Sequence, residues 1–143
     1  MNEPPLKLAI EIAAKAHAGQ YDKQEQPYIQ HPIAVMWAVE AFGDEAKMVA
    51  VLHDVVEDTS VTLDDLRQQG IPEVVVVAVD AISKRKGESY ETYLSRVQEN
   101  DLAFKVKVED IKHNLSRMKG LPPREVEYLT KKYARALHFF GIA

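Results

Sequence analysis

Residues 44–58, DEAKMVAVLHDVVED, decide the fold class. The stretch begins with an aspartate, which is a good helix N-cap, and it predicts one continuous helix. On such a helix residues four apart point in nearly the same direction, which places His53 over Glu57 and Asp54 over Asp58. Four ionisable side chains then crowd one side of a helix whose other side is strongly apolar.

Further helices are predicted on both sides of this stretch. Thr62 with Asp65 has the pattern of a capping box, and Ser89 is a predicted N-cap. The valines at 74–77 also suit a strand, but no partner strand is visible elsewhere, so a helix is preferred. The predicted helices cover about residues 5–17, 31–41, 62–70, 72–84, 89–99, 101–118 and 122–141, with a polar loop at 20–30. The sequence therefore predicts an all-α fold, a single-domain helical bundle.

Length and composition narrow the class of protein. The chain has 143 residues and a formal net charge of −4 at pH 7, which suits one domain spanning residues 1–143. The negative charge argues against binding to nucleic acid polymers or acidic membranes. No apolar run approaches the ~20 residues of a membrane span, and the N-terminus does not resemble a signal peptide. We therefore expect a cytoplasmic protein. There is no cysteine, which excludes thiolate metal ligands and cysteine nucleophiles.

Several ionisable side chains are candidates for chemistry. Within residues 53–58 an imidazole beside carboxylates suits a divalent metal; the alternative is a solvated acidic helix end, which the helix dipole opposes. His31 precedes a proline, where helix capping is the more common role. Asp110 shares a helix face with Asn114, and alone the pair suits an ordinary solvated face. The other histidines are expected to pack near the loop (His17) or to lie on the surface or a helix face (His113 and His138).

Taken together, these residues carry a family resemblance. His31, then His53-Asp54, then Asp110 resemble the H…HD…D signature of the HD-domain metal-dependent phosphohydrolases. The HD dipeptide alone is weak, but longer matches occur in order: AKAHAGQ, Lys23, PYIQHP, LHDVVEDT and the VKxxDxxxN pattern of residues 106–114. These stretches resemble the hydrolase domain of RelA/SpoT homologues and the small alarmone hydrolases, which implies the helical HD-domain fold.

The resemblance implies a metal centre. It assigns one ion, usually manganese in this family, to His31, His53, Asp54 and Asp110. Two imidazoles and two carboxylates leave positions for water and a phosphate oxygen, as a catalytic site needs. Glu57 and Asp58 match the family's acidic pair. One would orient or deprotonate the attacking water and the other would protonate the leaving oxygen, and the sequence leaves open which does which.

The resemblance also implies a small phosphorylated nucleotide as substrate. The family reaction removes pyrophosphate from the 3′ position of guanosine tetra- or pentaphosphate. Lys23 matches a lysine near the base, and Asn114 matches a residue near the ribose. Lys84, Arg85 and Lys86 are candidates for contacts with the terminal phosphates, with a solvated helix end as an equal alternative.

One departure from the family concerns the base. Asp22 stands where the family typically has arginine, and it offers acceptors in place of a planar fork of donors. The base preference is therefore open between guanosine and adenosine. Two alternative functions follow: a nucleotide phosphomonoesterase acting on a nucleoside monophosphate or NADPH, and a non-catalytic nucleotide-binding module.

Overall fold

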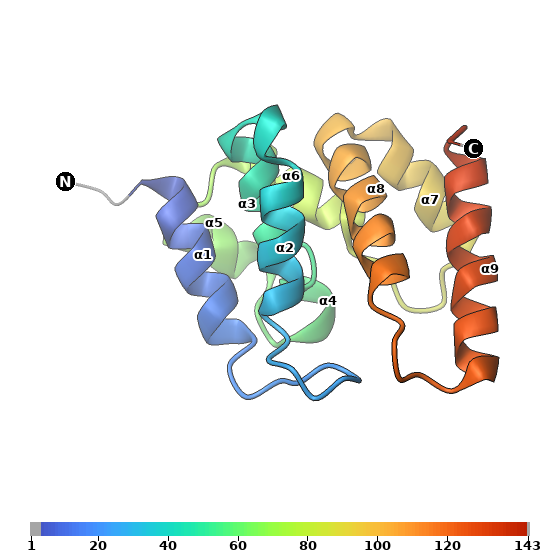
Figure 1. Ribbon diagram of the computed structural model, residues 1–143. Helices are drawn as coiled ribbons and strands as arrows, with labels where there is room; N and C mark the ends of the chain where they lie inside the picture. Colours follow the sequence, from blue (N-terminus) through green and yellow to red (C-terminus); the bar gives the residue numbers. More distant parts are fainter. Residues whose placement is uncertain (1–3, 143) are drawn as a thin grey trace.

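The computed structural model describes residues 4–142, which form helices joined by loops (Figure 1). In chain order these are α1 (Pro5–Ala16), α2 (Gln30–Ala38), the 3-10 helix η1 (Glu40–Phe42), α3 (Asp44–Leu52), α4 (Val55–Asp58), α5 (Leu63–Gln69), α6 (Glu73–Ile82), α7 (Tyr90–Glu99), α8 (Asp101–Ser116) and α9 (Pro123–Phe139). Within residues 4–142 there is no strand beyond an isolated bridge between Tyr21 and Pro27. The predicted all-α bundle is confirmed.

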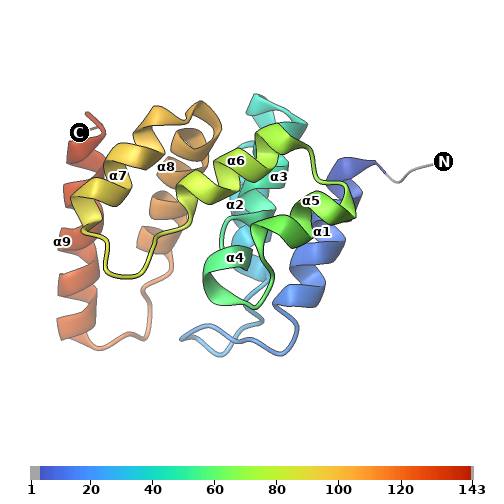
Figure 2. The ribbon, with the colours of Figure 1, turned by 180° about the vertical axis from the view of Figure 1, so that it is seen from behind.

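Helix α3 carries the centre of the core. It contacts α1, α2, α6 and α8, and the views from the front and from behind show these helices on opposite sides of it (Figures 1 and 2). Residues 48–52 are all buried. A helix that is apolar all round is stable only when neighbouring elements cover it. The polar residues that directly follow α3 are therefore held in position by the core.

The helix predicted over residues 44–58 is interrupted at His53 and Asp54. His53 Nδ1 lies 2.6 Å from the carbonyl oxygen of Ala50, which in a regular helix would accept a backbone amide. The chain turns there and resumes as the short helix α4. The prediction of one continuous helix was wrong, although the Asp58 amide still donates to the carbonyl oxygen of Asp54, four residues back, at 2.9 Å. Asp54 Oδ2 lies 3.1 Å from His53 Nε2, while Glu57 extends to the loop after α6.

Most other local signals act as predicted. Thr62 and Asp65 form the capping box, with the Asp65 amide 3.1 Å from Thr62 Oγ1, and Ser89 caps α7. The valine run lies in α6, where Val75 and Val76 are buried while the flanking valines are exposed. Two boundaries differ: the helix predicted over 31–41 divides into α2 and η1, and Asp44, predicted as an N-cap, is the first residue of α3. No helix in the described part of the chain is long and apolar enough to cross a bilayer.

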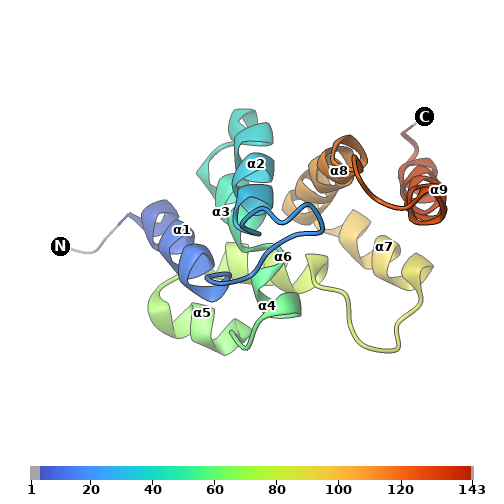
Figure 3. The ribbon, with the colours of Figure 1, turned by 60° about the horizontal axis from the view of Figure 1, so that its bottom comes forward.

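Loops that border the site gather at one end of the bundle. Figure 3 turns this end forward and shows loop 17–29, α4 and the connection from α8 to α9. Asp22 organises the first of these loops, because its Oδ1 accepts from the backbone amides of Gln24 and Gln26, both at 2.9 Å. This carboxylate thus stabilises a turn that lies over the ends of α2 and α8.

Candidate active site

Four side chains predicted to bind metal meet between α2, α3 and α8. Asp110 Oδ1 lies 2.8 Å from His31 Nε2 and 3.2 Å from His53 Nε2. Asp54 Oδ2 lies 3.1 Å from His53 Nε2 and 3.8 Å from His31 Nε2. The two histidines and Asp110 are buried. The fold therefore brings the four residues together from three separate parts of the chain.

This set of donors fits a divalent ion. The ligand atoms of His31, His53 and Asp54 lie within 4.8 Å of one another. Burial lowers the pKa of His31, which favours the neutral imidazole that metal binding needs. Burial would also lower the pKa of His53, but Asp54 and Asp110 raise it well above its usual range. Two carboxylates this close therefore attract positive charge, and imidazole with carboxylate suits an ion of intermediate hardness.

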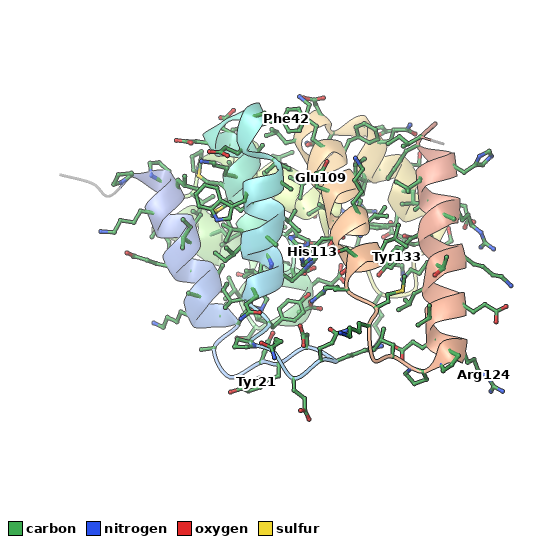
Figure 4. All side chains as sticks on the ribbon, in the orientation of Figure 1. Tyr21, Phe42, Glu109, His113, Arg124 and Tyr133 are labelled. Carbon is green, nitrogen blue, oxygen red and sulfur yellow. The ribbon has the colours of Figure 1, made fainter. Side chains whose placement is uncertain are left out.

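His113 on α8 contacts the second ring nitrogen of His31. The two Nδ1 atoms are 2.7 Å apart, and the rings stack with centroids 5.0 Å apart and an interplanar angle of 23°. Figure 4 shows His113 between α8 and α2. A hydrogen bond at Nδ1 fixes the ring and leaves His31 Nε2 facing Asp110. His113, predicted as a surface or helix-face residue, lies on a face of α8, where it is half-buried and packs at the site.

The Asp110 carboxylate is held by two further residues of α8. Lys107 Nζ donates to Oδ2 at 2.9 Å, and Asn114 Nδ2 donates to Oδ1 at 3.2 Å. Burial alone would raise the pKa of Asp110, but the Lys107 ammonium and the His53 ring hold it well below its usual range. Asp110 is therefore a charged carboxylate of fixed orientation. Asn114, predicted to bind substrate, also orients this carboxylate.

Tyr28, in the loop before α2, orients the other carboxylate. Its hydroxyl donates to Asp54 Oδ2 at 2.5 Å. Burial and the Asp54 charge both raise the pKa of Tyr28, so the hydroxyl keeps its proton and remains a donor. Neither Tyr28 nor Lys107 was predicted to be a site residue, although both lie inside family motifs, PYIQHP and VKxxDxxxN. Their position beside signature residues was the available signal.

Glu57 and Asp58, the predicted acidic pair, lie on α4 next to this cluster. Glu57 Oε1 accepts from the backbone amide of Lys84 at 2.7 Å. Burial and the charges on Asp54 and Glu57 raise the pKa of Asp58 to about 6. A carboxyl group that titrates near neutrality is suited to proton transfer. The two acids therefore differ, since one is held by a loop amide and the other has the perturbed pKa.

Two pockets near the cluster offer aromatic and basic side chains, beside a third of about 430 Å³ that His31 and His113 line. The first, of about 420 Å³, lies between loop 20–28, the end of α8 and the start of α9. We call it the aromatic pocket, because Tyr21, Tyr28 and Tyr133 line it together with Lys23, Asn114 and Arg117. Figure 4 shows Tyr21 in the loop and Tyr133 on the side of α9 that faces α8. Both predicted substrate-binding residues thus lie in this pocket, where Lys23 also pairs with Glu125 of α9.

The second pocket, of about 610 Å³, is a basic groove between the loop after α6 and helix α9. Its cations are Lys84, Lys131, Lys132 and Arg135, and its aromatic residues are Tyr90 and Tyr128. Of the three cations proposed from the sequence to meet phosphates, only Lys84 lines this groove. Arg85 instead pairs with Asp80 at 3.3 Å.

A family model described as "HD domain" matches residues 9–118. The chain belongs to the HD domain family. This match covers most of the chain and includes the complete H…HD…D signature, from His31 to Asp110. The family predicted from the sequence motifs is therefore confirmed.

Several known proteins resemble this HD domain. It is 32% identical over 153 residues to a probable GTP pyrophosphokinase of Mycobacterium leprae, covering 96% of this chain and 19% of that protein. It is 31% identical over 148 residues to a guanosine-3′,5′-bis(diphosphate) 3′-pyrophosphohydrolase of Haemophilus influenzae, covering 92% of this chain and 22% of that protein. The chain thus spans about a fifth of the length of these curated relatives.

A solved structure shares the fold. It is described with the words "a metazoan ortholog of SpoT hydrolyzes ppGpp and plays a role in starvation responses". The two structures superpose with a TM-score of 0.83 at 21% sequence identity, covering 98% of this chain and 87% of the other. At this identity the likeness establishes the arrangement of helices. The HD-type bundle is therefore confirmed at the level of fold.

Proposed function

We propose that this chain is a metal-dependent phosphohydrolase that removes the 3′-pyrophosphate from (p)ppGpp-like nucleotides. The observation that carries the proposal is the position of the acidic pair, beside a cluster of two histidines and two aspartates and close to two pockets of different chemistry. The names of relatives matched over more than nine-tenths of the chain support the same reaction. We propose that the single domain suffices for it and that the protein works in the cytoplasm.

In this proposal His31, His53, Asp54 and Asp110 hold one divalent ion, Mn²⁺. When bound, the ion supplies Lewis-acid chemistry: it makes water more acidic and neutralises charge on a phosphate. Tyr28 and Lys107 keep the two aspartates oriented. Preformed orientation of this kind avoids reorganisation during the reaction.

We assign different roles to the two acids. Asp58, with a pKa near 6, accepts a proton from the attacking water at neutral pH. Glu57, held by the Lys84 amide, accepts a hydrogen bond from that water and orients it. Asp58 then passes this proton to the leaving 3′ oxygen as the bond from that oxygen to phosphorus breaks and the bond from water forms, so both acids end in their starting protonation states.

The basic groove supports a substrate with several phosphates. The Lys132 ammonium forms no ion pair with the residues described, and burial together with the nearby Lys107 and Lys84 lowers its pKa. The Tyr90 hydroxyl is buried with no hydrogen-bond partner within residues 4–142. Both groups gain a partner when a phosphate enters the groove. We therefore propose that phosphates lie toward α9 and the loop after α6.

Product analysis tests the function. Purified protein with Mn²⁺ would be incubated with guanosine and adenosine 3′-pyrophosphates, NADPH and nucleoside monophosphates. We expect pyrophosphate from the first two substrates, and a much lower rate after replacing Asp54 by Asn. Orthophosphate from a monophosphate would instead establish the phosphomonoesterase alternative, and no turnover of any compound by metal-loaded protein would contradict the proposal.

A further inference from the structure

The aromatic pocket contains one arginine whose donors are only partly used. Arg117 Nε donates to Asn114 Oδ1 at 3.1 Å, and Nη1 points at Asp22 Oδ2 at 3.4 Å. Its guanidinium lies over the Tyr28 ring, 6.0 Å from the centroid. Nη2 has no hydrogen-bond partner in the described part of the chain. The side chain is therefore held from two sides with its outer edge available to the pocket that it lines.

Asp22 lines the pocket, but both oxygens of its carboxylate already have partners within the protein. Oδ1 accepts from two loop amides, and Oδ2 faces Arg117. Its side chain is only 12% exposed. A ligand that used this carboxylate would have to break the loop turn or the ion pair. Asp22 therefore positions Arg117 and contributes little direct recognition.

The place of Arg117 links the pocket to the metal-ligand cluster. Asn114 joins it to Asp110 through two hydrogen bonds, and Tyr28 beneath it donates to Asp54. A nucleotide whose 3′ phosphates lie at the cluster has its base within reach of an adjoining pocket. The tyrosine rings of the pocket then provide stacking surfaces for that base, and the arginine edge is left to contact the edge of the base.

We propose that Arg117 makes the aromatic pocket selective for guanine over adenine. Guanine presents two neighbouring acceptors, O6 and N7, to which an arginine fork donates in parallel. Adenine presents an amino donor in place of O6, and a guanidinium has no acceptor to offer it. The arginine missing at position 22 is thus replaced by one from the end of α8. This inference rests on the proposed function for the orientation of the nucleotide.

Equilibrium binding tests the inference separately from turnover. The full chain, stripped of metal with EDTA, would be titrated calorimetrically with guanosine and adenosine 3′,5′-bisphosphates. We expect guanosine bisphosphate to bind about 10- to 100-fold more tightly, the discrimination typical of one bidentate arginine–guanine contact. The inosine analogue, which keeps O6 and N7 but lacks the 2-amino group, should bind as tightly as the guanosine compound.

Variants of Arg117 and Asp22 test whether Arg117 causes the preference for guanine. Arg117→Met should reduce the preference to about twofold or less, and Arg117→Lys, which keeps the charge but loses the fork, should reduce it nearly as much. Asp22→Asn should reduce it partly, because the amide still serves the loop but no longer attracts Arg117. The matched control is Arg124→Lys on the exposed start of α9. Melting temperatures close to wild type would show that these variants fold.

The outcomes separate the two proposals. Equal affinity for both bases, no binding of either at millimolar concentration, or a preference retained in Arg117→Met would each overturn the role of Arg117. Loss of preference in the Arg117 variants but not in the control would establish it. Hydrolysis of the 3′-pyrophosphate is measured independently, so a failure of that reaction leaves the binding result interpretable.

Discussion

The metal-ligand cluster and the basic groove are built in opposite ways. In the cluster every ligand side chain has a second partner inside the protein, as His31 has His113 and Asp54 has Tyr28. In the groove Lys132, whose ammonium lies over the Tyr90 and Tyr133 rings, has no ion-pair partner among residues 4–142, the Tyr90 hydroxyl has no hydrogen-bond partner there, and α9 buries only Ala136. The difference separates the two tasks. In the proposed reaction, the core holds the metal-binding side chains in place before substrate arrives, while the groove keeps positive charge available for the phosphates.

The largest effect is expected from breaking the cluster at Asp110. Asp110→Asn removes one ligand charge and leaves Lys107 and His53 without their shared carboxylate. We expect loss of stoichiometric metal, at least a 1000-fold fall in kcat/KM, and destabilisation of the metal-free protein by about 3 kcal/mol. Elemental analysis, kinetics and urea unfolding measure the three effects. Asp101→Asn, an exposed position at the start of the same helix, is the control, and full metal content in Asp110→Asn would refute the ligand assignment.

A substitution in the acidic pair is expected to slow the reaction without removing the metal. Glu57→Gln removes the carboxylate that orients the attacking water and should lower kcat by about 100- to 10,000-fold, while metal content stays at one ion per chain. The amide still accepts the bond from Lys84, so the loop keeps its place. Glu11→Gln on the exposed face of α1 is the control. Retained activity in Glu57→Gln would remove it from the mechanism.

His113 is expected to act on metal affinity. Replacing it by Phe keeps a ring beside His31 but removes the Nδ1 contact, so the His31 ring loses its fixed orientation. We expect metal affinity to fall about 10- to 100-fold, with stability of the metal-free protein changed much less. His113→Asn, which retains a polar atom near the ring, should recover part of the affinity. Competition with a chelating dye measures it, His138→Gln is the control, and unchanged affinity in His113→Phe would leave the contact without a role.

The residues of the site also show which structural features can be predicted from the sequence. The proposed ligands His31, His53, Asp54 and Asp110 can be picked out from the sequence because their types and order form a motif, and the structure brings their side chains together. The break after α3 cannot be picked out in this way, since it depends on His53 Nδ1 reaching the Ala50 carbonyl, and helix periodicity does not reveal that competition.

Partners from distant parts of the chain were the hardest to predict. His113 contacts His31 across 82 residues, and Arg117 faces Asp22 across 95. From composition or spacing alone, His113 is an ordinary polar residue of α8, and Arg117 is an ordinary polar residue at the end of that helix. Asp22 illustrates the consequence: the sequence indicates a reversed charge in the base pocket, whereas the structure shows a carboxylate already occupied by a loop and by Arg117.

The smallest expected effect is the amount by which ionised Asp58 lowers the stability of the folded protein. Its pKa is raised from 3.8 to about 6 in the folded protein, so the folded state holds this proton more tightly than the unfolded state. Stability should therefore fall as the pH rises from about 4 to about 6, and remain lowered above that range. Asp58→Asn should stabilise the metal-free protein at pH 7.5 by on the order of 1 kcal/mol, after allowance for solvent screening, and by almost nothing at pH 3.5.

Urea unfolding at the two pH values measures this difference, with Glu11→Gln as the exposed carboxylate control. Adding Mn²⁺ sharpens the comparison, because a cation in the cluster favours the ionised form of Asp58 and should reduce the stabilising effect of Asp58→Asn at pH 7.5. An equal gain at both pH values would mean that the substitution acts through packing and not through charge. A gain confined to neutral pH and reduced by metal would mean that the folded protein keeps a destabilised carboxylate beside the cluster, where the proposed reaction needs a proton acceptor.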